Sequence, residues 1–156
     1  MRLFPCFLAI AAILAAGCEH FPAHHAGHAP DAAADGRQAV EFPEPMRTHT
    51  LANMRDHLAS LQEIQQALAD GAPDRAAEIA ETRLGMSSLG LHGAHDVAKF
   101  MPEGMQAIGT EMHKSASRFA VEAANSGATG NVKPPLAALA GVTKQCVACH
   151  AGYRMK

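Results

Sequence analysis

The sequence has few aromatic side chains. Among 156 residues there is no Trp, one Tyr and six Phe, and aromatics make up only 4% of the chain. Sheets draw much of their core from aromatic and β-branched residues, whereas the apolar residues here are mostly Ala, Leu and Met, which favour helices. We find no useful length of strand-like alternation and no internal repeat. The sequence therefore predicts an all-α protein with room in its core for a large planar cofactor.

The sequence also lacks any excess of positive charge. Lys and Arg number 13 against 15 Asp and Glu, which gives a formal net charge of -2. Binding to nucleic acid calls for a clustered basic surface, so no nucleic-acid partner is predicted. Neither a nucleophile and base pair nor a pair of carboxylates stands out along the chain, and we therefore predict no enzymatic activity.

The N-terminus has the pattern of an export signal. Met1 and Arg2 form a short positive region, and the apolar run over 3–16 that follows is too short to cross a bilayer comfortably. It ends in small residues before Cys18, which is typical of a bacterial lipoprotein cleavage site. We predict a signal peptide over 1–17, a periplasmic location, and membrane contact only through a lipid on Cys18. The alternative is ordinary signal cleavage nearby, which would leave Cys18 without a lipid.

Residues 18–43 are predicted to be a flexible tether. They are rich in Ala, Pro, Gly, His and Asp and have no apolar periodicity. Four histidines in this segment could bind copper, nickel or zinc, although a flexible chain loses conformational entropy when it forms such a site. They are His20, His24, His25 and His28. The favoured interpretation is a solvated linker between a lipid anchor and a folded domain.

From Pro45 onward the apolar residues recur at helical spacing. The predicted helices cover 45–70, 74–89, 105–124 and the segment from Pro134 onward, with a broken connection over 90–104. The stripe that the first helix is predicted to bury comprises Leu51, Met54, Leu58, Leu61 and Leu68. Four helices, each apolar along one stripe, predict an antiparallel four-helix bundle over 44–156.

Near the C-terminus lies Cys146-Val147-Ala148-Cys149-His150, which has the C-x-x-C-H pattern of covalent c-type haem attachment. On a helix, positions i, i+3 and i+4 share one face, so both thiols can reach the two vinyl groups of one haem. His150 follows the second thiol directly and is then aimed at the iron. We therefore predict one covalent haem c, bound by Cys146 and Cys149 and ligated by His150.

Two other uses of a C-x-x-C pair are less favoured. A thioredoxin-type redox pair requires a βαβ setting, which the sequence lacks, and a zinc site requires a second pair of ligands, which His113 alone does not supply. The remaining cysteines already have a place, since Cys6 lies in the signal peptide and Cys18 at the lipid site. No thiol is left for a structural disulfide.

A haem motif on the last helix of an exported helical bundle resembles the cytochrome c′ family and its low-spin, Met-ligated relatives. The resemblance covers about 45–156. It rests on the segment from Cys146 to Arg154, on Arg47 and Leu51 in the first helix, and on the bundle layout. It implies that Arg47 and Arg154 pair with the haem propionates, since a guanidinium group matches a carboxylate. It also implies redox partner proteins and allows a homodimer through the first two helices.

The residue on the other side of the iron decides the function. By the resemblance Leu51 occupies the distal position, where an aliphatic residue leaves the iron open to NO or CO. Met54 lies on the same helical face and could instead ligate the iron, as Met does in the low-spin relatives, and His49 is a further candidate. The first hypothesis is a single-electron carrier in a periplasmic redox chain, and the alternative is a haem protein that binds NO or CO. A third hypothesis is a metal-binding accessory protein that uses the His-rich tether.

Three further histidines, His92, His95 and His113, lie in the predicted domain. His92 and His95 could share a helical face and form half of a metal site, or supply a ligand from the connection, if a helix ran through Gly93. Gly90 and Gly93 argue against such a rigid scaffold, so ordinary solvated histidines are the favoured interpretation.

Overall fold

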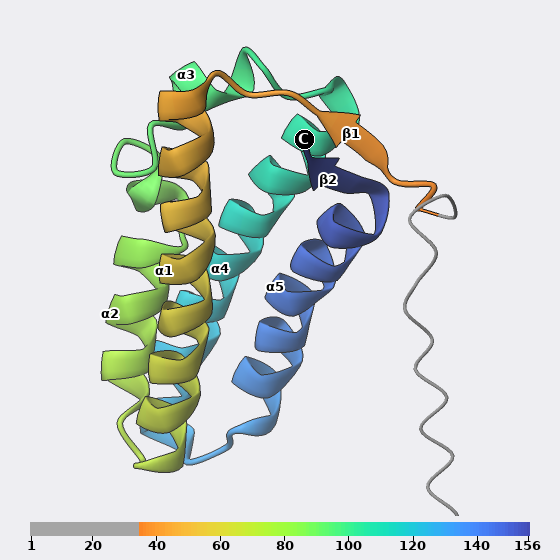
Figure 1. Ribbon diagram of the computed structural model, residues 1–156. Helices are drawn as coiled ribbons and strands as arrows, with labels where there is room; N and C mark the ends of the chain where they lie inside the picture. The colour runs from red at the N-terminus through yellow and green to blue at the C-terminus, as the bar shows by residue number, and fades with distance from the viewer. Residues whose placement is uncertain (1–34) are drawn as a thin grey trace, which may run out of the picture. The chain divides into compact units, whose positions relative to one another are not determined.

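The computed structural model describes residues 35–156, which are mostly helical and confirm the all-α expectation (Figure 1). Two short strands, β1 (Gln38–Val40) and β2 (Tyr153–Met155), come first and last among the described elements. The longer helices are α1 (Glu44–Ala69), α2 (Pro73–Arg83), α4 (Glu103–Thr129) and α5 (Lys133–Gly152). The 3₁₀ helix η2 (Met86–Ser88) and the short helix α3 (Ala94–Ala98) lie in the connection from α2 to α4. Within this part of the chain, no helix combines the length and the apolar character needed to cross a membrane.

Proline and glycine set the ends of the helices, as the sequence predicts. Pro45, Pro73 and Pro134 lie in the first turns of α1, α2 and α5, where the fixed φ of proline suits the helix and its missing N–H costs no hydrogen bond. Gly71 and Gly130 follow α1 and α4 with φ of 69° and 67°, a left-handed conformation that glycine adopts without a steric penalty. The starts of α1, α2 and α5 and the end of α1 therefore lie close to their predicted positions, whereas α4 ends at Thr129, before Gly130, and not at the predicted 124.

α2 ends at Arg83, earlier than the helix predicted over 74–89. The chain turns at Gly85, where a Cβ atom would lie 2.8 Å from the backbone oxygen of Glu81 and closer still to its carboxylate. A residue without a side chain permits this close approach, and the chain continues as η2 and α3 instead of extending α2.

Replacing Gly85 by Ala should lower the free energy of unfolding by about 1–3 kcal/mol, the usual cost of forcing extra volume into a packed site. Urea unfolding followed by circular dichroism measures the change. Gly90→Ala is the matched control, because a Cβ atom at Gly90 meets nothing within 4 Å. Equal stability of the two variants would show that the close approach at Gly85 is relieved at no cost.

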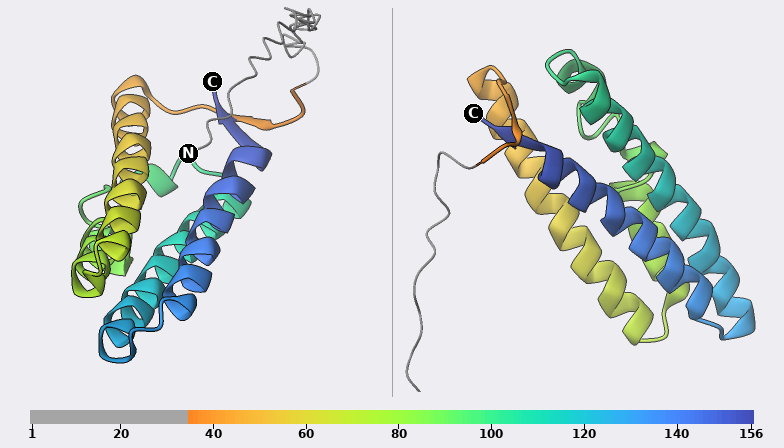
Figure 2. Two further views of the ribbon diagram at one scale, coloured as in Figure 1. Left: turned by 90° about the horizontal axis from the view of Figure 1, so that it is seen from below. Right: turned by 90° about the vertical axis from the view of Figure 1, so that its right-hand side faces the viewer.

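The main core forms where α1 packs on α2, α2 on α4, and α4 on α5 (Figures 1 and 2). Many of its buried residues are alanines, which let the helix axes approach closely, and the larger fully buried side chains include Ile64, Leu84, Phe119 and Val142. α4 also extends to Thr129, past the predicted end at 124. At Gly127 a Cβ atom would lie 3.4 Å from Pro73 of α2, so the small residue lets the two helices touch there.

The buried face of α1 differs from the predicted leucine stripe. Leu58 is 70% exposed, and Leu51 and Met54 are half-buried. The buried residues of α1 are Thr50, Ser60, Ile64 and Ala67. Two of these are polar, and each hydroxyl is satisfied within the helix, since Thr50 donates to the carbonyl of Met46 at 2.8 Å and Ser60 to that of Asp56 at 2.8 Å. Leucine spacing therefore predicted the buried face only in part, since Leu61 and Leu68 pack against the main core whereas Leu58 is exposed.

A second cluster forms where the two strands meet. β1 pairs with β2 in parallel, with Val40 opposite Met155, and the buried members of the cluster are Val40, Phe42, Val97 and Met105. Val40 and Phe42 are 3% and 7% exposed, although both lie in the range predicted to be a tether. The compact unit begins at Gly36, because these two apolar side chains and the strand tie the segment to the end of α5.

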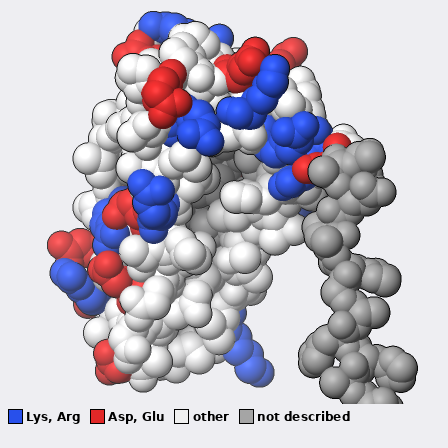
Figure 3. Space-filling view, viewed as in Figure 1, with Lys and Arg blue, Asp and Glu red and all other residues white. Residues whose placement is uncertain are grey.

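One side of the helical arrangement is left open. α1 and α5 are not packed extensively on each other within the described residues, although α2 and α4 link them. The space-filling view in Figure 3 shows a hollow between α1 and α5. The predicted signal peptide, Cys18 and the four tether histidines lie outside the described residues.

Candidate functional site

The two cysteines of the C-x-x-C-H motif lie on the last turns of α5. Both thiols are free and half-buried, and they are three residues apart on one face of the helix. Cys146 packs against the main core, whereas Cys149 packs against the second cluster. α5 therefore presents both thiols along one line, on a face of the helix that packs against these two clusters.

The thiols have the electrostatics of unreactive cysteines. Burial raises the pKa of both thiols, and the neighbouring Cys146 raises that of Cys149 further. Redox-active C-x-x-C pairs instead depend on a lowered pKa, which a helix N-terminus or a positive neighbour provides. Cys146 and Cys149 lie near the C-terminal end of α5, so the structure argues against thiol–disulfide exchange.

His150 lies directly after Cys149, and its side chain is exposed. It continues a line along α5 that includes Leu136 and Val147, which are 50% and 63% exposed. The Arg37 guanidinium donates to the carbonyl of His150 at 3.4 Å and ties the segment before β1 to this end of the helix. α5 thus carries an accessible imidazole and exposed apolar side chains beside the two thiols.

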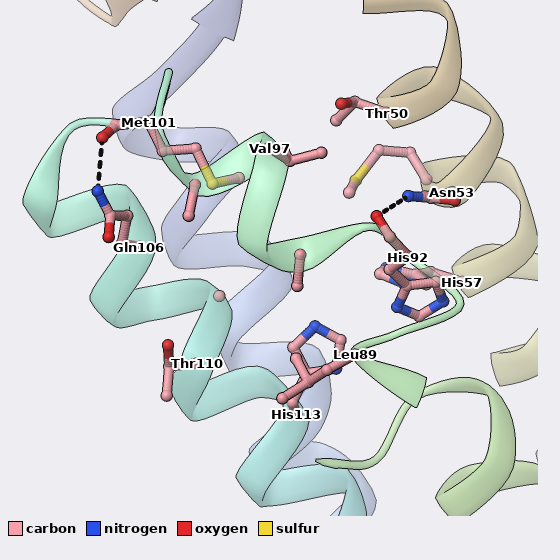
Figure 4. Close-up of a pocket in the computed structure, with 14 residues that line it drawn as sticks. Thr50, Asn53, His57, Leu89, His92, Val97, Met101, Gln106, Thr110 and His113 are labelled. Atoms are coloured by element: carbon pink, nitrogen blue, oxygen red, sulfur yellow. Dashed lines mark hydrogen bonds between the residues drawn. The ribbon is translucent and has the colours of Figure 1, made fainter. Parts of the chain in front are cut away.

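The candidates for the distal position of the iron lie on α1. This helix, together with α3 and α4, bounds a cavity of about 140 Å³ (Figure 4). Met54 lines this cavity together with Thr50 and Asn53, whereas Leu51 does not. An apolar cavity of about 150 Å³ holds one benzene-sized molecule, so this one is far smaller than a haem. The motif residues of α5 do not line it. The structure therefore brings Met54 to a cavity but does not bring it together with the motif.

The other predicted residues lie at the same end of the fold. Arg47 is in the first turns of α1, 4.0 Å from the Glu44 carboxylate, and such an exposed pair contributes little stability. Arg154 is in β2, directly after the helix that carries the motif. The Nε2 atom of His49 lies 3.0 Å from the carbonyl oxygen of His92, which holds His49 to the connection before α3.

Three histidines that are distant in the sequence meet at the wall of the cavity. The ring centres of His57 and His92 are 4.6 Å apart, those of His92 and His113 are 5.4 Å apart, and those of His57 and His113 are 6.1 Å apart. Sequence reasoning missed this cluster, because no local spacing links residues from α1, from the connection and from α4. Helical spacing places His57 on the same face of α1 as the buried Thr50 and Ile64, and this spacing could have predicted that His57 points into the interior.

His92 and His95 do not share the helical face that a metal site would need, and the favoured interpretation of ordinary solvated histidines holds for His95 but is wrong for His92 and His113, which are 5% and 8% exposed. His92 is 5% exposed, whereas the His95 side chain is 89% exposed and lies 3.4 Å from Asp96. Gly93 separates them with φ of 59°, a left-handed conformation that breaks the helical face they would need to share.

The clustered histidines are held neutral. Burial lowers the pKa of each ring, because a charged imidazolium loses its hydration in the interior. For His57, the neighbouring rings of His92 and His113 add to burial and lower the pKa to about 4. All three rings are therefore neutral at pH 7, with a lone pair on each imidazole.

Among residues 35–156, no group of three or more His, Cys, Asp or Glu side chains is placed so that it could hold a metal ion. No family model, curated protein or solved structure matches this chain.

Proposed function

We propose that this protein is an exported mono-haem c-type cytochrome, similar to the cytochrome c′ family, that carries single electrons between redox partner proteins. The observation that carries the proposal is the C-x-x-C-H motif on α5, whose two thiols are free, half-buried and unsuited to redox exchange. The motif lies on α5, which borders the hollow between α1 and α5. Leu58 of α1 and Val147 of α5 are 70% and 63% exposed, and large apolar side chains left uncovered in this way suit the binding of another apolar group.

In this proposal α1, α2, α4 and α5 form an antiparallel four-helix bundle that a haem c completes. The haem, when bound, supplies the one-electron couple. Cys146 and Cys149 hold it through thioether bonds, and the exposed imidazole of His150 ligates the iron from the α5 side. The fit is supported by the free state of both thiols, since neither is part of a disulfide.

We assign the distal position to Met54 rather than to Leu51. The assignment rests on the resemblance and on the chemistry of the thioether, which favours electron transfer at a raised reduction potential, since the cavity that Met54 lines does not include the motif residues. Arg47 and Arg154 lie near the ends of α1 and α5 that carry these ligands, so their guanidinium groups suit the haem propionates. An open iron that binds NO or CO is the competing function.

The proposal includes export and anchoring by residues outside the described part of the chain. The signal peptide over 1–17 would be removed, Cys18 would carry a lipid, and the cytochrome would lie in the periplasm. A solvated segment after Cys18 would then let the haem domain reach partners at some distance from the membrane.

Replacing both Cys146 and Cys149 by Ala should abolish covalent haem, because both thioether bonds are lost. Denaturing gel electrophoresis with haem staining, after expression with a c-type maturation system, reads the result directly. Cys18→Ala is the matched control, since it removes a thiol outside the haem motif and should leave the haem covalent. Haem staining of the double variant, or none of the native chain, would contradict the proposal.

A further inference from the structure

The cluster of His57, His92 and His113 has no part in the proposed haem attachment. The three rings come from three segments, α1, the connection between η2 and α3, and α4 (Figure 4). All three line the same cavity of about 140 Å³. Each of these segments thus delivers one imidazole to a shared space, and the one buried ring atom without a partner among the described residues is Nε2 of His92, which carries a cost because buried polar groups require partners.

Hydrogen bonding leaves metal-binding nitrogens free. The Nδ1 atom of His113 lies 2.8 Å from the carbonyl oxygen of Leu84, so Nδ1 carries the proton and Nε2 keeps its lone pair. Metal-bound histidines are commonly oriented in this way, by a backbone carbonyl on the second nitrogen. In Figure 4 one ring nitrogen of His113 points into the cavity.

His92 supplies an independent indication of a missing ligand. It is 5% exposed, and its Nε2 atom is buried without a hydrogen-bond partner among the described residues. Its backbone is held in place, because the carbonyl oxygen accepts from Asn53 at 3.1 Å and lies 3.0 Å from Nε2 of His49. The ring can therefore turn toward a bound ion without moving the chain.

The spacing of the rings matches a tetrahedral zinc site. With Zn–N bonds of about 2.0–2.1 Å, two histidine nitrogens on one tetrahedral ion are about 3.3–3.4 Å apart and their ring centres about 5 Å apart. The ring centres of the three histidines are 4.6 to 6.1 Å apart, and Nε2 of His57 and Nδ1 of His92 lie 3.4 Å apart in a hydrogen bond between the two rings. The donor atoms do not meet at one point among the described residues, so binding of an ion requires the rings to turn and this hydrogen bond to break.

We propose that His57, His92 and His113 form a second metal site, which binds one zinc ion or a similar divalent transition metal. The three rings would occupy three of the four coordination positions of the ion, and the fourth would face the cavity. None of its residues lies on α5, although Met54, the proposed distal ligand of the haem iron, lines the same cavity. The lowered pKa of each ring suits it, because a metal ligand must be neutral imidazole.

A zinc titration of the full mature protein with its haem in place tests the proposal. Native mass spectrometry counts the ions, and zinc-edge X-ray absorption reports the ligands without interference from iron. We expect one zinc per chain with three imidazole nitrogens at about 2.0–2.1 Å. His57→Gln should weaken zinc binding by more than the roughly 100-fold that loss of a supporting group can cost.

Three controls make the result specific. His95→Gln removes an exposed histidine and should leave zinc binding unchanged. Replacing His20, His24, His25 and His28 by Ala removes the tether histidines and should also leave it unchanged. The haem spectrum and haem content of His57→Gln should equal those of the native protein, which separates this site from the proposed function and shows that the variant is folded. No zinc, zinc lost with the tether histidines, or zinc retained by folded His57→Gln would overturn the proposal.

Discussion

The reduced native protein should not bind CO, whereas the reduced Met54→Leu variant should bind it. Loss of the thioether leaves the distal side of the iron without a protein ligand, so the sharp low-spin α-band should broaden and the spectrum should shift when CO is added. Leu and Met have similar volumes, which keeps the cost in stability below about 1.5 kcal/mol. Visible absorption spectra of the reduced protein, with and without CO, measure both effects.

Met46→Leu is the control for this substitution. Met46 is also a half-buried methionine of α1, but it packs against the second cluster and does not line the cavity. Its replacement should leave the spectrum and the response to CO unchanged. If the native reduced protein itself bound CO, the iron would be open on its distal side, and the competing function in NO or CO binding would replace electron transfer.

The local features of the fold could be predicted because their causes are local. Pro45 and Pro73 begin helices through their own φ, and Gly71 ends α1 through a conformation that other residues avoid. The placement of Cys146 and Cys149 on a helix follows from the apolar spacing around them. Signals of this kind lie within a few residues of the feature that they determine.

The tertiary features could not be predicted in the same way. On α1, Leu58 is exposed and Ser60 is buried, although leucine is the more apolar residue. Burial there depends on which helix packs against α1, and α2 contributes small residues to the face that includes Ser60. Strand β1 is short, and Val40 is buried only because β2 lies beside it. Its three residues carry too little pattern to distinguish a strand from a linker.

The two candidate sites differ in how readily the sequence predicts them. The haem motif spans five consecutive residues, from Cys146 to His150, and one helix positions all its donors. The histidine cluster needs α1, α4 and their connection to be packed before its rings meet. Gly93 contributes by ending the turn after His92 in a left-handed conformation, which lets His92 enter the interior while His95 stays outside.

Lowering the pH from 7 to 4 in the presence of a chelator should destabilise the protein by roughly 3 kcal/mol through His57. Its pKa is about 4 in the fold against an ordinary 6.5, and each pKa unit is worth about 1.36 kcal/mol. Because the fold holds the ring neutral, the unfolded chain binds the proton first, and stability present above pH 6.5 is lost as the pH falls through 4. Urea unfolding at a series of pH values measures the loss.

The histidines account for this pH window, because the perturbed carboxyls act at lower pH. The pKa values of Asp56 and Glu81 lie below their ordinary values of 3.8 and 4.5, held down by hydrogen bonds from Arg83 and from serine hydroxyls, so their contribution is lost mainly below pH 4.5. His57→Gln should therefore flatten the curve between pH 6.5 and 4, whereas His95→Gln should not. A full decline in folded His57→Gln would assign the acid sensitivity to another group. Zinc should steepen the native curve, since protons and metal compete for the same lone pairs.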